Sequence, residues 1–225
     1  RLVNHSLLRY EREAERYEIH EFLRQYSISN LSSAEMEQIR TRHLDYFAGF
    51  AETVEPWRQC GEYKINLVRM KPEIGNFRTA LVWSVQKPAY SSQGLRLAAG
   101  LEHFWTLGGH SNEGYEWLSR LLAVPNAGAS RKVQATALRA LSTLESNSTG
   151  DYGGVLALLE QSLDLWEAIG DENGRAKTLD CLGTLELKHH NLNGARVQHQ
   201  EALALAQKHD YQWGMCASLF GLGNI

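Results

Sequence analysis

Leu179-Asp180-Cys181-Leu182-Gly183 is the stretch that decides the fold of this 225-residue chain. Its spacing returns 40 residues later as Leu219-x-x-Leu222-Gly223, and Leu138-x-x-Leu141 precedes it by 41 residues. A fixed interval of this size is typical of proteins built from stacked structural repeats. The sequence therefore predicts a repeat array in its last third.

The segments between these stretches recur with the same interval. The matching positions are Gly154, Val155 and Leu163 against Gly194, Ala195 and Leu203. Each unit is interpreted as a pair of helices, over 131–149 and 152–169, then 173–189 and 192–208, with a third unit opening near 211 and cut off at Ile225. A single pair cannot bury its apolar face, whereas stacked pairs bury a continuous core and leave a concave groove.

Turn residues separate the predicted helices. Gly150-Asp151, Gly170-Asp171 and Asn191 stand between them, and Gly or Asn just past a helix end can adopt the left-handed conformation that caps it. We interpret Gly183 and Gly223 as small residues at helix crossings, where close approach of two helices requires them.

The groove is predicted from the first helix of each pair. If Leu141 and Leu182 face the core, a row of positions faces away from it. These candidate partner-binding positions are Arg139, Thr143, Asn147, Asp180, Thr184, Lys188 and, in the third unit, Phe220. The alternative is that the row is solvated surface, since a polar row of mixed charge is what most exposed helices show.

The first thirty residues carry a different pattern. Residues 6–10 and 16–20 alternate apolar and polar side chains around the polar stretch 11–15, which predicts a β-hairpin. A helix with Phe22, Leu23 and Tyr26 on one face is expected next. Strand, turn, strand and helix at this size suggest the end of a winged-helix domain.

Composition narrows the function classes. The chain is 43 % apolar and 22 % charged, with 23 Lys and Arg against 26 Asp and Glu and a net charge of −3, which disfavours a charge-driven grip on nucleic acid or an anionic membrane. No stretch is long and apolar enough for a transmembrane helix, and no signal peptide opens the chain. Cys60, Cys181 and Cys216 fit reduced thiols in a cytoplasmic protein. Because the chain lacks an initial Met and stops inside an apolar pattern, we expect a fragment of a longer protein.

Catalytic and metal-binding motifs are missing from the sequence. A P-loop needs G-x-x-x-x-G-K-[ST], and none of the seven lysines follows a glycine. The histidines that could act as zinc ligands are His189, His190 and His199. Adjacent histidines, however, point to different faces of a helix, and no cysteine lies nearby. We therefore predict no enzyme, no metal site and no cofactor within this chain.

The repeat region, residues 131–225, resembles tetratricopeptide repeats (TPR). The similarity lies in L-x-x-L-G followed by a second helix with Ala195 and Ala202-Leu203. The usual period is about 34 residues, so the units here are longer than most. The resemblance implies an all-α, TPR-like α-α superhelix.

The N-terminal region resembles the winged-helix module of STAND-class signalling ATPases, among them LuxR-type and AfsR-type bacterial regulators. The matching segments are 2–8 and 17–26, where Ile19-His20-Glu21 stands in place of a Met-His-Asp-like triplet that opens a helix. In that family the histidine contacts the β-phosphate of bound ADP, so the resemblance implies that His20 senses nucleotide. A plain capping or packing role for His20 is the alternative.

Residues from about 35 to 122 resemble the helical linker of the same regulators. The matching segments are 42–47, 73–83 and 95–101, and Trp83, Trp105 and Trp117 in this region are predicted to be core residues. The domains expected are a partial winged-helix module over 1–33, a helical linker over 34–130 and TPR-like repeats over 131–225.

Together these resemblances imply the regulatory arm of a STAND ATPase transcription regulator. A protein, peptide or small-molecule effector would bind the repeat groove, ADP or ATP would bind an upstream module of the parent protein, and DNA would be contacted only through another domain. Homo-oligomerisation on activation is also implied. Two alternatives remain: a TPR interaction scaffold without nucleotide switching, and an independent enzyme.

Overall fold

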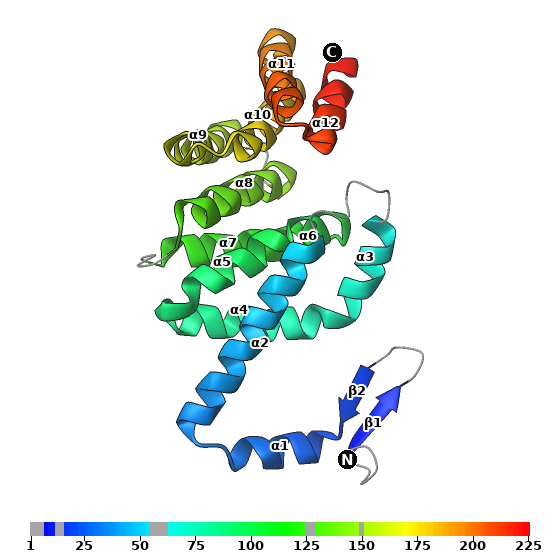
Figure 1. Cartoon of the computed structure of the whole chain (residues 1–225), viewed down its shortest axis with the longest axis vertical. Helices are drawn as coiled ribbons and strands as arrows, with labels where there is room; N and C mark the ends of the chain where they lie inside the picture. Colours follow the sequence, from blue (N-terminus) through cyan, green and yellow to red (C-terminus); the bar gives the residue numbers. More distant parts are fainter. Residues whose placement is uncertain (1–6, 12–15, 55–62, 125–128, 149–150) are drawn as a thin grey trace. The chain divides into compact units, whose positions relative to one another are not determined.

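The computed structural model describes residues 7–11, 16–54, 63–124, 129–148 and 151–225. The chain divides into two compact units, residues 1–42 and 43–225. Helix α2 (Ser33–Val54) runs through this division. Within the described residues the only sheet is one two-stranded hairpin and the rest of the regular structure is helical (Figure 1), so the predicted all-α class is confirmed.

The first unit contains the predicted hairpin. Strands β1 (Leu8–Glu11) and β2 (Arg16–Ile19) pair antiparallel, and the connecting residues 12–15 lie outside the described part. Tyr10 and Tyr17 stand opposite each other with ring centroids 4.9 Å apart. Cross-strand aromatic pairs of this kind stabilise a hairpin register.

Helix α1 (Glu21–Ser29) follows the hairpin directly, as expected. None of its residues is buried, and the side chains of Phe22 and Tyr26 are 76 % and 69 % exposed. The apolar face predicted for this helix therefore exists, and in the described part of the chain it is exposed.

The second unit begins with the linker helices, packed around an aromatic core. Their bounds are α3 Tyr63–Met70, α4 Ile74–Gln86, α5 Ser91–Gly100, α6 Glu102–Leu107 and α7 Ser111–Ala123, with short 3₁₀ turns at Lys71–Glu73 and Pro88–Tyr90. Trp83 and Trp105 are buried, as predicted. Trp117 is only half-buried, because its Nε1 donates to Glu113 (3.3 Å) at the edge of the core.

The repeat helices follow in antiparallel pairs. They are α8 Arg131–Ser148, α9 Tyr152–Ile169, α10 Glu172–Lys188, α11 Leu192–Lys208 and α12 Gln212–Gly223, each beginning and ending within two residues of its predicted bounds where both were given. Helix α8 packs against α9 and α10 against α11, and α12 stands beside α10 and α11 (Figure 1). No helix in the described part is long and apolar enough to cross a membrane.

Helix starts in this region recur every 20 residues. The side-chain oxygens of Asp151, Asp171 and Asn191 each accept a hydrogen bond from the backbone N–H three residues later. These are N-caps, which satisfy donors that a helix start otherwise leaves without partners. Each helix with its turn therefore occupies half of the 40-residue interval.

The turn predictions were right for Gly170 and wrong for Asn191. Gly170 is left-handed (φ 69°) and caps α9, as expected. Asn191 has a φ of −84° and caps the start of α11, whereas the left-handed residue is His190 (φ 61°). The reason is that Asn favours the N-cap position. Asn191 therefore lies at the start of α11, and the left-handed position falls one residue earlier, at His190.

Helix crossings depend on Gly183, as predicted, but not on Gly223. A Cβ on Gly183 would come within 2.8 Å of the His199 ring, whereas a Cβ on Gly223 would meet nothing within 4 Å. The second close approach is at Gly221, which lies against the same ring. The imidazole of His199 on α11 is therefore held between glycines of α10 and α12.

Candidate functional site

The candidate site is a cavity of about 360 Å³ beside α8 and α10 in the second unit. Six of the seven predicted groove positions line it: Arg139, Thr143, Asn147, Asp180, Thr184 and Lys188. The structure thus brings together residues about 40 apart in the sequence, because α8 and α10 occupy equivalent places in successive pairs.

Phe220 is the exception among the predicted positions. Its side chain is 74 % exposed on α12 and does not line the cavity. Trp213, in the first turn of α12, forms the wall there instead. Phe220 therefore lies on a different face of α12 from the face that we predicted by analogy with α8 and α10.

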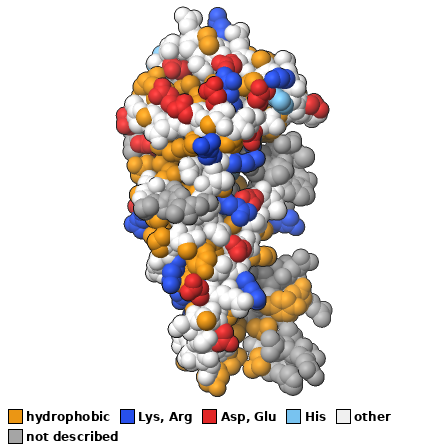
Figure 2. Space-filling view, turned by 60° about the vertical axis from the view of Figure 1, so that its left-hand side comes forward, with side chains coloured by type: hydrophobic (Ala, Val, Ile, Leu, Met, Phe, Trp, Pro, Cys, Tyr) orange, Lys and Arg blue, Asp and Glu red, His pale blue; other side chains and the backbone are white. Residues whose placement is uncertain are grey.

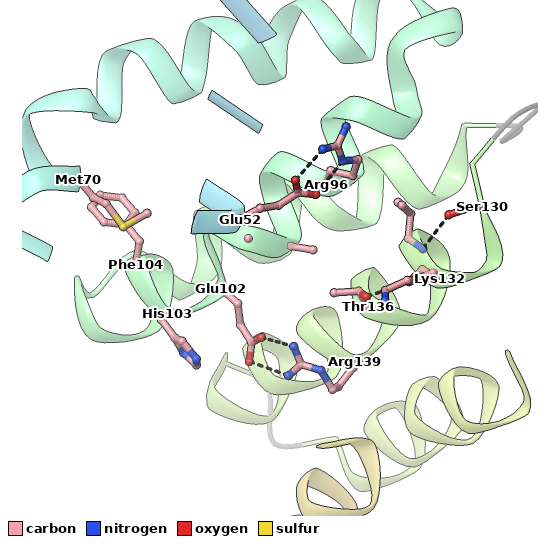
Figure 3. A pocket seen from close by; sticks show the side chains of 13 residues that line it. Glu52, Met70, Arg96, Glu102, His103, Phe104, Ser130, Lys132, Thr136 and Arg139 are labelled. Atoms are coloured by element: carbon pink, nitrogen blue, oxygen red, sulfur yellow. Dashed lines mark hydrogen bonds and ion pairs between the residues drawn. The ribbon is translucent and has the colours of Figure 1, made fainter. Parts of the chain in front are cut away.

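Arg139 was expected to be exposed, and this was wrong. It is buried, and its guanidinium pairs with Glu102 of α6 through Nη2–Oε2 (2.9 Å) and Nη1–Oε1 (3.3 Å) (Figure 3). The linker helix α6 covers the part of α8 that repeat spacing alone leaves open. Removing one partner of this buried ion pair is costly, because the other charge is left uncompensated. The Cys181 thiol lies beside the pair, and burial raises the pKa of this thiol.

Asp180 is half-buried rather than fully exposed. Its Oδ1 accepts a hydrogen bond from Nδ1 of His199 (2.9 Å), whose side chain is 1 % exposed. Asp180 thus joins the cavity wall to the crossing of α10, α11 and α12. Sequence reasoning weighed His199 only as a poor zinc ligand and missed this contact.

Lysine side chains stand at both ends of the α10 wall. Lys188 Nζ donates to Ser146 Oγ (2.8 Å) and to Asn147 Oδ1 (3.3 Å) on α8. Lys177 Nζ lies 5.5 Å from the ring centroid of Tyr211. The two lysines are separated by roughly 16 Å along the helix axis, from the rise per residue. Lys177 was missed, although it continues the row of Asp180, Thr184 and Lys188 by one turn.

Hydroxyl groups occupy the middle of the cavity wall. Thr184 is exposed, Thr143 is half-buried, and Ser142 is buried against the backbone of α8. The cavity therefore offers ammonium groups at its ends and hydroxyls between them. Such a surface can bind a polar ligand through hydrogen bonds. Within the described residues no group of three or more His, Cys, Asp or Glu side chains could hold a metal ion.

His20 lies in the first unit, at the N-cap of α1. Its Nδ1 accepts a hydrogen bond from the backbone N–H of Phe22 (3.3 Å), and the two rings stack at 5.4 Å. The imidazole is exposed. Because Nδ1 accepts, Nε2 is the donor nitrogen of the neutral ring. The capping role weighed for His20 is therefore present in the structure, and the exposed ring leaves room for a second contact.

The surface charge is mixed. Figure 2 shows acidic and basic side chains interspersed over the repeats on one face of the molecule, with apolar side chains between them. This face carries no single-sign field of the kind that steers nucleic acid to a protein.

Comparison with known proteins finds similar sequences in mycobacteria. Putative HTH-type transcriptional regulator Rv0890c of Mycobacterium tuberculosis (strain H37Rv) and Putative HTH-type transcriptional regulator Mb0914c of Mycobacterium bovis are each 26 % identical to this chain over 216 residues. The match covers 92 % of this chain and 24 % of the relative, so the chain spans about a quarter of the length of these relatives. No family model matches the sequence.

Among solved structures, the fold is similar to the crystal structure of BtubC (BKLC) from P. vanneervenii. The TM-score is 0.54, with 16 % sequence identity over 86 % of this chain and 87 % of that chain. At this identity the likeness concerns the fold alone. It agrees with an α-helical architecture over most of the chain.

Proposed function

We propose that this chain is the regulatory arm of a bacterial transcription regulator of the STAND ATPase class, acting in the cytoplasm. Its helix pairs bind an effector or partner protein, and this binding is coupled to a nucleotide switch in another part of the parent protein. The observation that carries the binding role is the convergence of six predicted groove positions on one cavity. The regulator role is supported by similarity to relatives named as HTH-type regulators.

The cavity favours a peptide that carries acidic side chains together with groups that can hydrogen-bond to the threonine hydroxyl. Lys177 and Lys188 present ammonium groups at its two ends, and Thr184 lies exposed between them. Trp213 adds an aromatic wall. An extended peptide spans about 3.3 Å per residue, so roughly five residues would reach from one lysine to the other.

Coupling would run through the contacts at the cavity wall. Asp180 connects the cavity wall to His199 and thus to the glycines of α10 and α12 that contact its ring. Arg139 connects the cavity wall to α6 of the linker through Glu102. A ligand shifts a two-state equilibrium only if it binds one state more tightly. An effector that alters the packing of α8 against α10 would meet this condition.

Peptide binding is tested with a displayed library of random peptides selected on the chain. Thr184→Trp, which fills the middle of the cavity, is expected to abolish binding of the selected peptides, and Lys188→Glu to weaken it severalfold. Arg196→Glu is the matched control, because Arg196 is exposed on α11 and does not line the cavity. Selected peptides that bind Thr184→Trp as well as the unaltered chain would remove this cavity from the function.

The nucleotide switch is tested in the full-length parent protein by release of fluorescently labelled ADP. His20→Ala is expected to accelerate release at least tenfold if the imidazole contacts the β-phosphate. His20→Asn is the matched variant, because Asn is an effective N-cap but its side-chain amide is shorter than the imidazole and does not reach the position of Nε2. Restoration of slow release by Asn would assign His20 to capping alone and leave the scaffold without nucleotide switching as the function.

A further inference from the structure

A second cavity lies where the linker helices meet the repeats. Its volume is about 440 Å³, and all of its lining residues belong to the second unit. The wall is formed by the ends of α2, α3 and α5, by α6, and by the first half of α8 (Figure 3). It shares Glu102, His103 and Arg139 with the groove cavity, so the Glu102–Arg139 pair stands between the two.

The inner wall of this cavity is apolar. Met70 of α3 and Phe104 of α6 are almost fully buried and line it, and Ala99 of α5 and Val133 of α8 continue the same surface. A volume of this size falls in the range of small-molecule pockets, which combine mostly apolar walls with a few placed polar groups. The apolar wall would receive the hydrocarbon part of a ligand.

The carboxylates in the wall are already neutralised. Glu52 accepts two hydrogen bonds from Arg96 (2.6 and 2.7 Å), and Glu102 pairs in the same two-point manner with Arg139 (Figure 3). Two-point pairs between Arg and carboxylate are geometrically specific. Neither pair therefore presents an uncompensated charge to a ligand.

Lys132 is the third cationic side chain of the lining, and it forms an exposed ion pair with Asp171. Its side chain is 69 % exposed, and its Nζ lies 3.2 Å from Oδ2 of Asp171, the N-cap residue of α10, which does not line the cavity. The lining thus carries three cationic side chains against two carboxylates, although the whole chain has a net charge of −3. Because an ion pair this exposed is weak, a ligand carboxylate can compete with Asp171 for the Lys132 ammonium group at the edge of the apolar wall.

We propose that this cavity binds a small amphipathic carboxylate, with its hydrocarbon part on the apolar wall and its carboxylate on Lys132. A phosphate dianion fits less well, because both guanidinium groups in the wall are engaged by carboxylates. A cationic ligand would be repelled by the Lys132 ammonium group. This site is separate from the groove proposed above, since of the predicted groove positions only Arg139 lines both cavities.

The chemical class is tested by isothermal titration of the chain with three eight-carbon probes: octanoate, 1-octanol and octylammonium. Octanoate is expected to bind about fivefold more tightly than 1-octanol, as an exposed charge pair of about 1 kcal/mol predicts. Octylammonium is expected to bind most weakly. Equal binding of octanoate and 1-octanol, or no saturable binding of octanoate, overturns the proposal.

The location is tested with variants on α8. Lys132→Met keeps the length of the side chain and is expected to abolish the preference for octanoate over 1-octanol, whereas Lys208→Met, an exposed position that lines neither cavity, leaves it unchanged. Val133→Trp fills the apolar wall and is expected to reduce octanoate binding at least tenfold. If that variant does not fold, as judged by circular dichroism, Thr136→Tyr at the same wall takes its place. Unchanged octanoate binding in the folded filling variant overturns the location.

Discussion

The linker helices α2–α7 and the helix pairs α8–α12 bury their apolar surface in different ways. The linker core contains Phe77, Phe104 and Trp105, each at most 1 % exposed, with ring centroids 5.8 Å and 5.3 Å apart between successive members. The rings meet edge to face, the arrangement that the charge distribution of aromatic rings favours. The linker is therefore a conventional core of large side chains.

The repeats use small side chains where their helices cross. Their separate apolar cluster consists of Val155, Leu159, Leu182 and Leu185, and the crossings of α10, α11 and α12 are at Gly and Ala positions. Each repeat helix contacts mainly its neighbours, so burial is spread along the array rather than concentrated. Both cavities lie along the junction between these two kinds of packing, where large and small side chains leave space.

The largest difference between the regions should appear on truncating Trp105. We expect Trp105→Ala to lower the free energy of unfolding by about 4 kcal/mol, since it removes a fully buried ring that packs against Gly114. Leu182→Ala in the repeats should cost about 2 kcal/mol, because the thinner array relaxes more readily. Urea unfolding followed by circular dichroism measures both. Equal costs would mean that the two regions share one uniform core.

The junction between the linker helices and the repeat helices is tested through the buried Glu102–Arg139 ion pair. Arg139→Met should destabilise the fold by about 3 kcal/mol, because Glu102 is left buried without its partner. The double variant Glu102→Leu with Arg139→Met should fall within about 1 kcal/mol of the unaltered chain, as replacement of both charges removes the desolvation cost. Chemical denaturation of the four proteins of this cycle gives the coupling. A double variant as unstable as the single one would contradict this.

Packing within the repeats is tested with glycines 40 residues apart. Gly183→Ala should destabilise by about 2 kcal/mol, because its Cβ would press on the His199 ring. Gly223→Ala should be neutral or stabilising by about 0.5 kcal/mol, since its Cβ meets nothing and the helix gains propensity. Thermal unfolding compares them. A similar change in stability at both positions would show that the close contact of Gly183 with His199 does not govern the effect.

The smallest expected effect concerns pH and the linker. Arg78 donates two hydrogen bonds to Glu113 (2.7 Å each), which joins α4 to α7 and lowers the pKa of the Glu113 carboxyl below its ordinary value of 4.5. A lowered folded-state pKa adds stability that is present above pH 4.5 and lost as pH falls through the folded value. Because the pair is partly exposed, its contribution should stay below about 1 kcal/mol.

The measurement for this pair is unfolding at pH 7 and at successive values below 4.5. Glu113→Gln should show a shallower loss of stability over that window than the unaltered chain. Identical pH profiles for the two proteins would argue against a lowered pKa at this carboxyl.

Several features were accessible from the sequence. Hydrophobic spacing and turn residues located α8–α11 and the start of α12 to within two residues, and they selected six positions that line one cavity, although Arg139 is buried rather than exposed. Local physics determines these, since periodicity and capping act over one or two turns. The 20-residue recurrence of Asp151, Asp171 and Asn191 was equally present in the sequence and would have given the helix starts directly.

Other features depended on contacts between distant segments. Arg139 is buried only because α6 crosses it, and Leu219 is 56 % exposed while its equivalent Leu179 is 4 % exposed. The two leucines share a motif but not an environment, because α11 covers α10 and no later helix of this chain covers α12 in the same way. A sequence motif alone does not predict whether another helix covers its residues.

The amino-acid sequence by itself determined the class of fold, the 40-residue interval and the polar row that became the groove, because helix formation and apolar periodicity are local properties of the chain. The tertiary structure alone decided which members of that row are free to meet a ligand and where the apolar cavity beside Lys132 lies. Burial, ion pairing and cavities arise from side chains of helices far apart in the sequence, and their geometry is set only when those helices pack.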